Sequence, residues 1–193
     1  MRNISLCIIY IHQVAVWNSG VLLTRLLDKL NQSTNQSIYK NKSIIELGCG
    51  AALSSIAVAK LGASSVLATD ANEEVLNLAK RNIERNDMIN VIQTAKLQWG
   101  IMDATEVADS ADIIIGSDLS YNSGSWVALA ETMATILKPD GIIIYLTLGH
   151  SGFNVGGELG GFLSVAENTG LRVLTRETTE WKDNLGTMVQ SMD

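Results

Sequence analysis

The chain has 193 residues, of which 47 % are apolar and 18 % are charged, and its formal net charge is −6. A chain of about this length usually forms one domain with a sizeable core, so we expect a single domain over residues 1–193. Fourteen Lys and Arg residues against twenty Asp and Glu leave no basic excess to neutralise phosphates. This balance argues against a protein that coats nucleic acid and favours a basic partner.

The N-terminal segment, residues 1–42, opens with an apolar run from Ile4 to Ile11 that predicts a buried strand. Behind Arg2 this run mimics a signal-peptide core, but it has no clean small-residue cleavage site and is far shorter than the ~20 apolar residues that span a bilayer. Cys7 and Cys49 lie in different surroundings, which supports neither a disulfide nor a metal site. We therefore expect a reduced, cytoplasmic or nuclear protein without a membrane partner.

The rest of this segment combines a helical pattern with a polar tract. Apolar side chains recur at helical spacing from Val16 to Leu30, which predicts a helix with one buried stripe. We expect this helix to pack on the site that the following segments form. The polar tract from Asn31 to Ser43 predicts a loop rather than a domain boundary, because a segment of about 40 residues rarely folds alone.

From residue 43 to the end, short apolar runs alternate with segments of helical periodicity. The apolar runs, which predict strands, are Ile44–Leu47, Ser65–Thr69, Val91–Leu97, Asp112–Ser117 and Ile142–Leu148. The helical segments are Leu53–Leu61, Glu73–Arg85, Trp126–Leu137 and Gly161–Thr169. This alternation predicts an α/β fold with a mostly parallel sheet and helices on both faces. The tripeptide Pro-Asp-Gly at 139–141 predicts a turn before the last run. The tail at 171–192 has a weak apolar pattern that predicts two closing strands.

Ligands of such open sheets bind beyond the carboxyl ends of the strands. The first run continues into ELGCGAA at 46–52, where glycines let the backbone turn and approach a ligand, and the next helix points its N–H groups at it. The second run ends at Asp70, 22 residues beyond Gly48, close to the offset at which a carboxylate reaches ribose hydroxyls. Taken singly, the loop could be a plain turn and Asp70 could cap the next helix with Glu73, in competition with Asn72. Together they predict a nucleoside cofactor.

The third small position of the glycine loop selects among nucleoside cofactors. A dinucleotide fingerprint needs glycine at position 53, where this chain has Leu53. The spacing E-x-G-x-G-x-A resembles motif I of the class I S-adenosylmethionine (SAM)-dependent methyltransferases, with Ala52 where the third glycine is commonest.

Two tryptophans add to this set. Trp99 follows the third run, where a flat aromatic side chain could lie against an adenine ring, and Trp17 begins the N-terminal helix. The alternative is that both fill the core, which is the role we expect for Trp126 and Trp181.

The segment after the fourth run, GSDLSY at 116–121, faces the place where a methyl acceptor would lie. Asp118 and Tyr121 are therefore the candidates for catalysis. The alternative is that Asp118 is a loop residue and that Tyr121 is a packing aromatic.

Assembled in order, these motifs resemble those of the seven-β-strand protein lysine methyltransferases of the methyltransferase-like family, of the family 16 type. The likeness covers about residues 14 to 150 and rests on VAVWNSGVLL, IIELGCGAALSSIAVAKLGASSVLATD, LQWG and IIIGSDLSY. It implies a Rossmann-like sheet of seven strands, SAM as the cofactor, and a lysine of a protein as the acceptor. Relatives act on chaperones, ATPases and translation factors, and we expect a similar protein substrate and a monomeric enzyme.

The resemblance also implies a role for each candidate residue. The residues implied to bind the cofactor are Trp17, Glu46, Gly48, Cys49, Gly50, Asp70, Trp99 and Ser117. Asp118 and Tyr121 belong to the signature that is associated with the acceptor amine. We assign Asp118 to aiming the amine by hydrogen bonding and Tyr121 to walling the channel. Since a carboxylate stabilises an ammonium, we expect the amine to lose its proton to water.

Other activities stay open at this point. A nucleic-acid or glutamine methyltransferase would show Asn/Asp-Pro-Pro-Tyr/Phe where this chain has Asp-Leu-Ser-Tyr, so we disfavour it. A protein histidine or arginine methyltransferase, a small-molecule methyltransferase and an inactive SAM-binding module all share the same cofactor half. We expect the glycine-rich stretch from Gly149 to Gly161 to border the acceptor channel, with His150 as a surface residue rather than a catalytic base.

Overall fold

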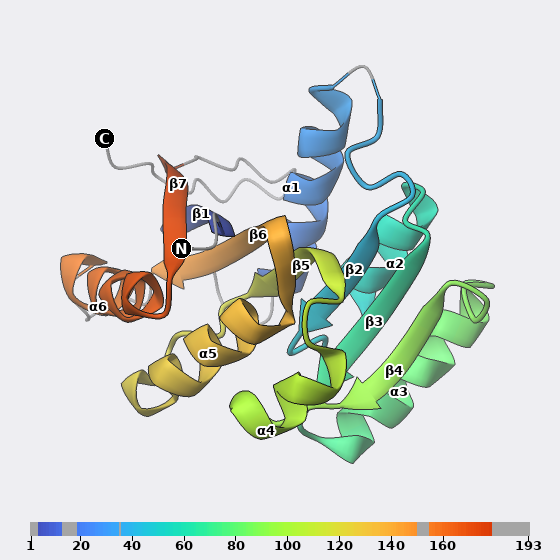
Figure 1. Cartoon of the computed structure of the whole chain (residues 1–193). Helices are drawn as coiled ribbons and strands as arrows, with labels where there is room; N and C mark the ends of the chain where they lie inside the picture. Colours follow the sequence, from blue (N-terminus) through green and yellow to red (C-terminus); the bar gives the residue numbers. More distant parts are fainter. Residues whose placement is uncertain (1–3, 13–18, 35, 150–154, 179–193) are drawn as a thin grey trace.

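The computed structural model describes residues 4–12, 19–34, 36–149 and 155–178, in which strands and helices alternate (Figure 1). The strands are β1 (Ile4–His12), β2 (Ser43–Leu47), β3 (Ser65–Asp70), β4 (Ile92–Lys96), β5 (Ala111–Ser117), β6 (Leu137–Gly149) and β7 (Leu171–Thr178). The α-helices are α1 (Ser19–Gln32), α2 (Leu53–Lys60), α3 (Glu73–Arg85), α4 (Ile101–Ala104), α5 (Trp126–Ile136) and α6 (Val155–Asn168). Short 3₁₀ turns at Thr105–Val107 and Ser123–Ser125 precede β5 and α5.

The strands form one sheet in the order β4-β3-β2-β5-β6-β1-β7, and each neighbouring pair is parallel. The chain runs outward from β2 to β4 on one side and returns to β5 on the other side. Strands β2 and β5 are therefore neighbours, with Leu47 paired to Gly116. A parallel sheet opens a ligand crevice where its strand order reverses, so this topology places the site beyond the ends of β2 and β5.

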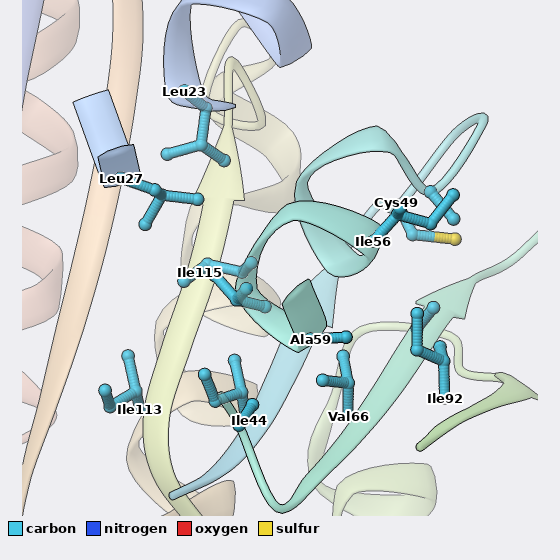
Figure 2. Packing of buried hydrophobic residues seen from close by; sticks show 14 of the residues in the cluster. Leu23, Leu27, Ile44, Cys49, Ile56, Ala59, Val66, Ile92, Ile113 and Ile115 are labelled. Atoms are coloured by element: carbon cyan, nitrogen blue, oxygen red, sulfur yellow. The ribbon is translucent and has the colours of Figure 1, made fainter. Parts of the chain in front are cut away.

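Helices cover both faces of the sheet (Figure 1). Leucines of α1 and apolar residues of α2 and α3 pack on one face, whereas α5 and α6 pack on the other. Figure 2 shows Leu23 and Leu27 of α1 pointing toward the strand that carries Ile115. Neighbouring strand residues alternate between the two faces, as with Ile44 and Ile45. Both are buried, which explains why the strands read as continuous apolar runs.

The predicted α/β fold is confirmed in this arrangement. The run Ile4–Ile11 forms β1, which lies between β6 and β7, a position that no local pattern indicated. The tail contributes β7, and the second closing strand that we predicted falls outside the described residues. No helix in the described part of the chain is both long and apolar enough to cross a membrane.

Two local predictions were wrong. The last helix begins at Val155 rather than at Gly161, where we predicted its start, so part of the glycine-rich stretch is helical. A Cβ at Gly161 would lie 2.5 Å from Cζ3 of Trp126, so glycine there permits the close approach of α6 to α5. His150 lies outside the described residues.

The turn predicted at 139–141 is instead an irregularity inside β6. Leu137 already pairs with Ala111, and the register then shifts until Ile142 pairs with Ile113. Between these two pairs β6 advances five residues and β5 two, and Asp140 in the extra stretch has a positive φ of 65°. The helix before it does end where expected, at Ile136.

Candidate functional site

Three loops meet at the carboxyl edge of the sheet, after β2, β3 and β5. The loop after β2 is joined to the end of β3, since the amide of Cys49 donates to the carbonyl of Thr69 at 2.8 Å. The loop after β5 reaches the first loop through Leu119, whose Cδ2 lies 2.7 Å from where a Cβ at Gly48 would be. The structure therefore brings together the glycine loop, Asp70 and the Asp118 segment, as the sequence predicted.

The glycine loop turns through a series of left-handed residues. Gly48, Gly50 and Ala52 have φ values of 61°, 53° and 61°, and such values favour glycine at the first two. Among the described residues, no heavy atom lies within 4 Å of the position that a Cβ at Gly50 would take. Ala52 is the N-cap of α2, and its methyl side chain accepts no hydrogen bond from the first turn of the helix, where the amide of Ser55 donates to Glu46. The open position at Gly50 lets a ligand approach the backbone of the loop.

Glu46 points into the protein rather than into this space. Its carboxylate is 4 % exposed and accepts hydrogen bonds from both the amide and the hydroxyl of Ser55, in the first turn of α2. Burial raises the pKa of Glu46 to about 7, against hydrogen bonds from Ser55 and Ser54 that lower it, and nearby Asp70 raises it further. The described contacts of Glu46 therefore hold the first turn of α2. Its contact with a cofactor stays a prediction.

This buried carboxyl predicts a pH-dependent stability. Because the folded pKa lies above the unfolded value of 4.5, the folded state retains the proton over a range in which the unfolded state loses it. The free energy of unfolding should fall by about 2–3 kcal/mol as the pH rises from 4.5 through 7. Glu46→Gln keeps an acceptor for Ser55 but carries no charge, so it should flatten this fall in urea unfolding between pH 5 and 8. Glu84→Gln, on the exposed surface of α3, should keep the wild-type slope, and a Glu46→Gln slope equal to it would contradict the assignment.

Asp70 lies half-buried at the end of β3 and faces the glycine loop. Its Oδ2 accepts the amide of Gly50 at 3.3 Å and its Oδ1 accepts the amide of Asn72 at 3.0 Å. The cap of α3 is Asn72, whose side chain accepts the amide of Glu74 at 2.8 Å. The capping alternative for Asp70 is therefore wrong, and the contact of its carboxylate with a ribose stays a prediction.

The LQWG turn after β4 is built around Trp99, which is half-buried and packs against the cluster of α5 and α6. The amide of Gln98 donates to Asp103, and the amide of Gly100 donates to the hydroxyl of Thr132 at 2.7 Å. The amide of Leu97 also donates to the carbonyl of Asp70 at 3.1 Å, which ties this turn to the end of β3. Trp99 thus contributes to the core and borders the site.

The segment after β5 leaves the sheet at once. Ser117 is the last strand residue and is half-buried, and Asp118 has a left-handed φ of 54°. The amide of Asp118 donates to the carbonyl of Leu146 at 2.7 Å. The side chain of Tyr121 is 66 % exposed, so it lies at the surface end of this segment.

The structure adds residues that the sequence did not indicate. Ser55 binds Glu46, the Asn82 side chain donates to the carbonyl of Ala51, and Tyr145 bonds to the loop that follows Asp118. Trp126, expected to be a core residue, packs against the core and also donates its indole N–H to the carbonyl of Ser120. Of these residues, only Tyr145 had a local signal in the sequence, because it is a tyrosine within the apolar run IIIYLT.

The N-terminal helix begins beside the first turn of α2. The hydroxyl of Ser54 donates to the carbonyl of Gly20 at 3.4 Å, and that of Thr24 lies 3.3 Å from Ser54 Oγ. This contact joins the start of α1 to α2, and the packing of α1 on a cofactor site stays a prediction. Trp17 itself and Trp181 lie outside the described residues. Over the part of the chain that the structure describes, no group of three His, Cys, Asp or Glu could hold a metal.

Comparison with known proteins places these features in a family. The family model described as "Lysine methyltransferase" matches residues 12–151. Calmodulin-lysine N-methyltransferase of Arabidopsis thaliana is 34 % identical over 104 residues, which are 52 % of this chain and 34 % of the relative. Protein N-lysine methyltransferase METTL21A of Danio rerio is 29 % identical over 67 % of this chain and 57 % of its own length.

Solved structures agree on the fold. Ribosomal protein L11 methylase from Lactobacillus delbrueckii subsp. bulgaricus superposes with a TM-score of 0.62 at 19 % identity, over 93 % of this chain and 81 % of that one. At this identity the likeness shows the Rossmann-like methyltransferase fold alone. The matched segment spans about a third of the Arabidopsis relative and somewhat over half of the Danio one.

Proposed function

Because the chain belongs to the lysine methyltransferase family, we propose that it transfers the methyl group of SAM to a lysine amine of a protein. The observation that carries this proposal is the packing of Leu119 against Gly48. It sets the Asp118 segment directly against the glycine loop, so that an acceptor held by one segment would meet a cofactor held by the other. Such proximity supplies a large part of the rate in group transfer.

The residues at this edge fit SAM. The carboxylate of Asp70 can accept hydrogen bonds from the two ribose hydroxyls, and the open space at Gly50 lets the backbone approach the ligand. Trp99 offers an aromatic surface beside them. When bound, SAM supplies a methyl group activated by its sulfonium.

In this proposal Asp118 binds and orients the acceptor amine. A half-buried carboxylate at the end of β5 can bind a lysine ammonium and, after the proton is lost, orient the amine by a hydrogen bond. A lysine has an ordinary pKa of about 10.4, and partial burial in the site lowers it. Since Asp118 opposes this proton loss electrostatically, water is the proton acceptor in this proposal. Tyr121 would wall the outer end of the channel.

The substrate side of the proposal follows from charge and from the relatives. A net charge of −6 attracts a basic, lysine-bearing partner. The names of the relatives, calmodulin-lysine and protein N-lysine methyltransferase, support a protein acceptor. We place the acceptor among proteins of the chaperone, ATPase or translation-factor kind, and we place a monomeric enzyme in the cytoplasm or nucleus.

Labelling a cell lysate tests this function. Purified protein with methyl-labelled SAM should transfer label to one or a few protein bands, and acid hydrolysis of those bands should release methyl-lysine. A reaction without the protein is the control. Methyl-histidine or methyl-arginine would move the assignment to those acceptors, label confined to small molecules would favour a small-molecule enzyme, and no added label would support an inactive module.

A further inference from the structure

A fully buried tyrosine, Tyr145 of β6, contacts the segment that carries Asp118. Its ring has no exposed surface, and it packs at 5.7 Å between centroids against Phe162 of α6. Its hydroxyl oxygen accepts the amides of Leu119 and Ser120, each at 2.8 Å, and its proton is donated to Ser120 Oγ at 3.0 Å. One phenol thus makes three hydrogen bonds to two consecutive residues.

Two successive amides can converge on one oxygen when the backbone curls around it, as in anion-binding nests. The curl begins at Asp118, whose φ of 54° is a conformation that an L residue rarely adopts. Burial raises the pKa of the Tyr145 phenol, and hydrogen bonds from Ser120 and Leu119 oppose that rise, so the phenol is neutral and keeps its proton for Ser120. The backbone of residues 118–120 is therefore folded around the neutral hydroxyl of Tyr145.

Other contacts hold the same residues from outside. The indole N–H of Trp126 donates to the carbonyl of Ser120 at 2.7 Å, and the amide of Asp118 donates to Leu146. The backbone from Asp118 to Ser120 is thus bonded at every residue to β6 or α5. The exposed Tyr121 follows directly after this anchored stretch.

Leu119 connects the anchored stretch to the glycine loop. Its side chain is buried, and its two methyl groups occupy the space that the missing side chains of Gly48 and Gly116 leave open. A Cβ at those positions would lie 2.7 Å and 2.9 Å from Leu119. If the Leu119 amide moved away from Tyr145, the contact between the Leu119 side chain and Gly48 of the glycine loop would therefore move as well.

We infer that Tyr145 is a positioning residue for methyl transfer, which acts through the amides of Leu119 and Ser120 on the backbone that presents Asp118. This inference rests on the proposed function for its catalytic consequence. The conformation of the loop can be measured without any transfer.

The test compares Tyr145→Phe with Tyr39→Phe, which removes a second fully buried hydroxyl. Tyr39 is fully buried and donates to the carbonyl of Leu27, in the second half of α1, at 2.8 Å, and it makes no described hydrogen bond to the glycine loop or to the Asp118 segment. Initial rates with labelled SAM and lysate protein should give a maximal rate at least tenfold lower for Tyr145→Phe, with KM for SAM within twofold of wild type. Tyr39→Phe should keep the wild-type rate, although both variants lose a buried hydrogen bond and some thermal stability.

Amide hydrogen exchange supplies the readout that is independent of activity. The amides of Leu119 and Ser120 should exchange at least tenfold faster in Tyr145→Phe than in wild type and should be unchanged in Tyr39→Phe. Unchanged exchange, or equal transfer rates of the two variants, would overturn the inference. If wild type transfers no label while the exchange result holds, the proposed function fails, and the catalytic role of Tyr145 fails with it.

Discussion

Replacing Asp118 by alanine should lower methyl transfer at least about a hundredfold while the affinity for SAM changes by no more than a few-fold. Asp118 is half-buried and directly follows β5, and in the proposed function its carboxylate binds and aims the acceptor amine. Loss of such an aiming group typically costs about two orders of magnitude, because the attacking atom is no longer held in line. SAM affinity should persist, since Asp70 and the glycine loop are untouched. Labelled-SAM transfer rates and calorimetric SAM binding measure the two quantities.

The backbone at Asp118 requires a matched control. Alanine is strained at a φ of 54°, so some of the effect could come from the main chain. Asp140 in β6 is exposed and has a similar φ of 65°, so Asp140→Ala makes the same substitution in the same backbone conformation at a position outside the site. Asp140→Ala should transfer at the wild-type rate, and Asp118→Asn, which tolerates this conformation, should lie between wild type and Asp118→Ala. Wild-type turnover by Asp118→Ala would refute the assignment.

Asp70→Ala should weaken SAM binding, in contrast to Asp118→Ala, which should lower the rate of methyl transfer. Each charge-assisted hydrogen bond to a carboxylate contributes about 1.5–3 kcal/mol, so the loss of even one bond to a ribose hydroxyl should raise the Kd for SAM at least about tenfold. The substitution also removes the acceptor of the Gly50 amide, which loosens the glycine loop in the same direction. Isothermal titration with SAM measures this change.

Asn72→Ala separates the ribose role of Asp70 from helix capping. Asn72 caps α3, so its loss should cost about 1 kcal/mol of stability and leave the Kd for SAM near that of wild type. If Asp70→Ala binds SAM as tightly as Asn72→Ala does, Asp70 does not hold the ribose. Together with Asp118→Ala, these variants assign binding and transfer to different strand ends.

The candidate site was predictable because its parts follow strand ends directly. Gly48 and Gly50 come after β2, Asp70 ends β3, and Asp118 comes after β5. Parallel strands bring their carboxyl ends to one edge, so a linear pattern of runs and motifs was enough to place these residues together. Their contacts with a cofactor stay predictions, as do those predicted for Glu46, Cys49, Trp17, Trp99 and Ser117.

Local errors had local physical causes. The helix α6 was missed over 155–160 because glycines disfavour helices, and its packing on Trp126 compensates for that preference. The bulge at Asp140 looked like a turn because Pro-Asp-Gly has the same short-range preferences in both settings.

By itself the sequence determined the α/β alternation, the glycine loop, Asp70 and the Asp118 segment, because each is a short-range pattern of apolar period and turn chemistry. The tertiary structure alone decided that Glu46 turns inward to Ser55, that Asn72 rather than Asp70 caps α3, and that β1 enters between β6 and β7. It also decided that Tyr145 holds the Leu119 amide across 26 residues of chain. Contacts between residues so far apart depend on how strands and helices pack, and they leave no periodic trace in the residues themselves.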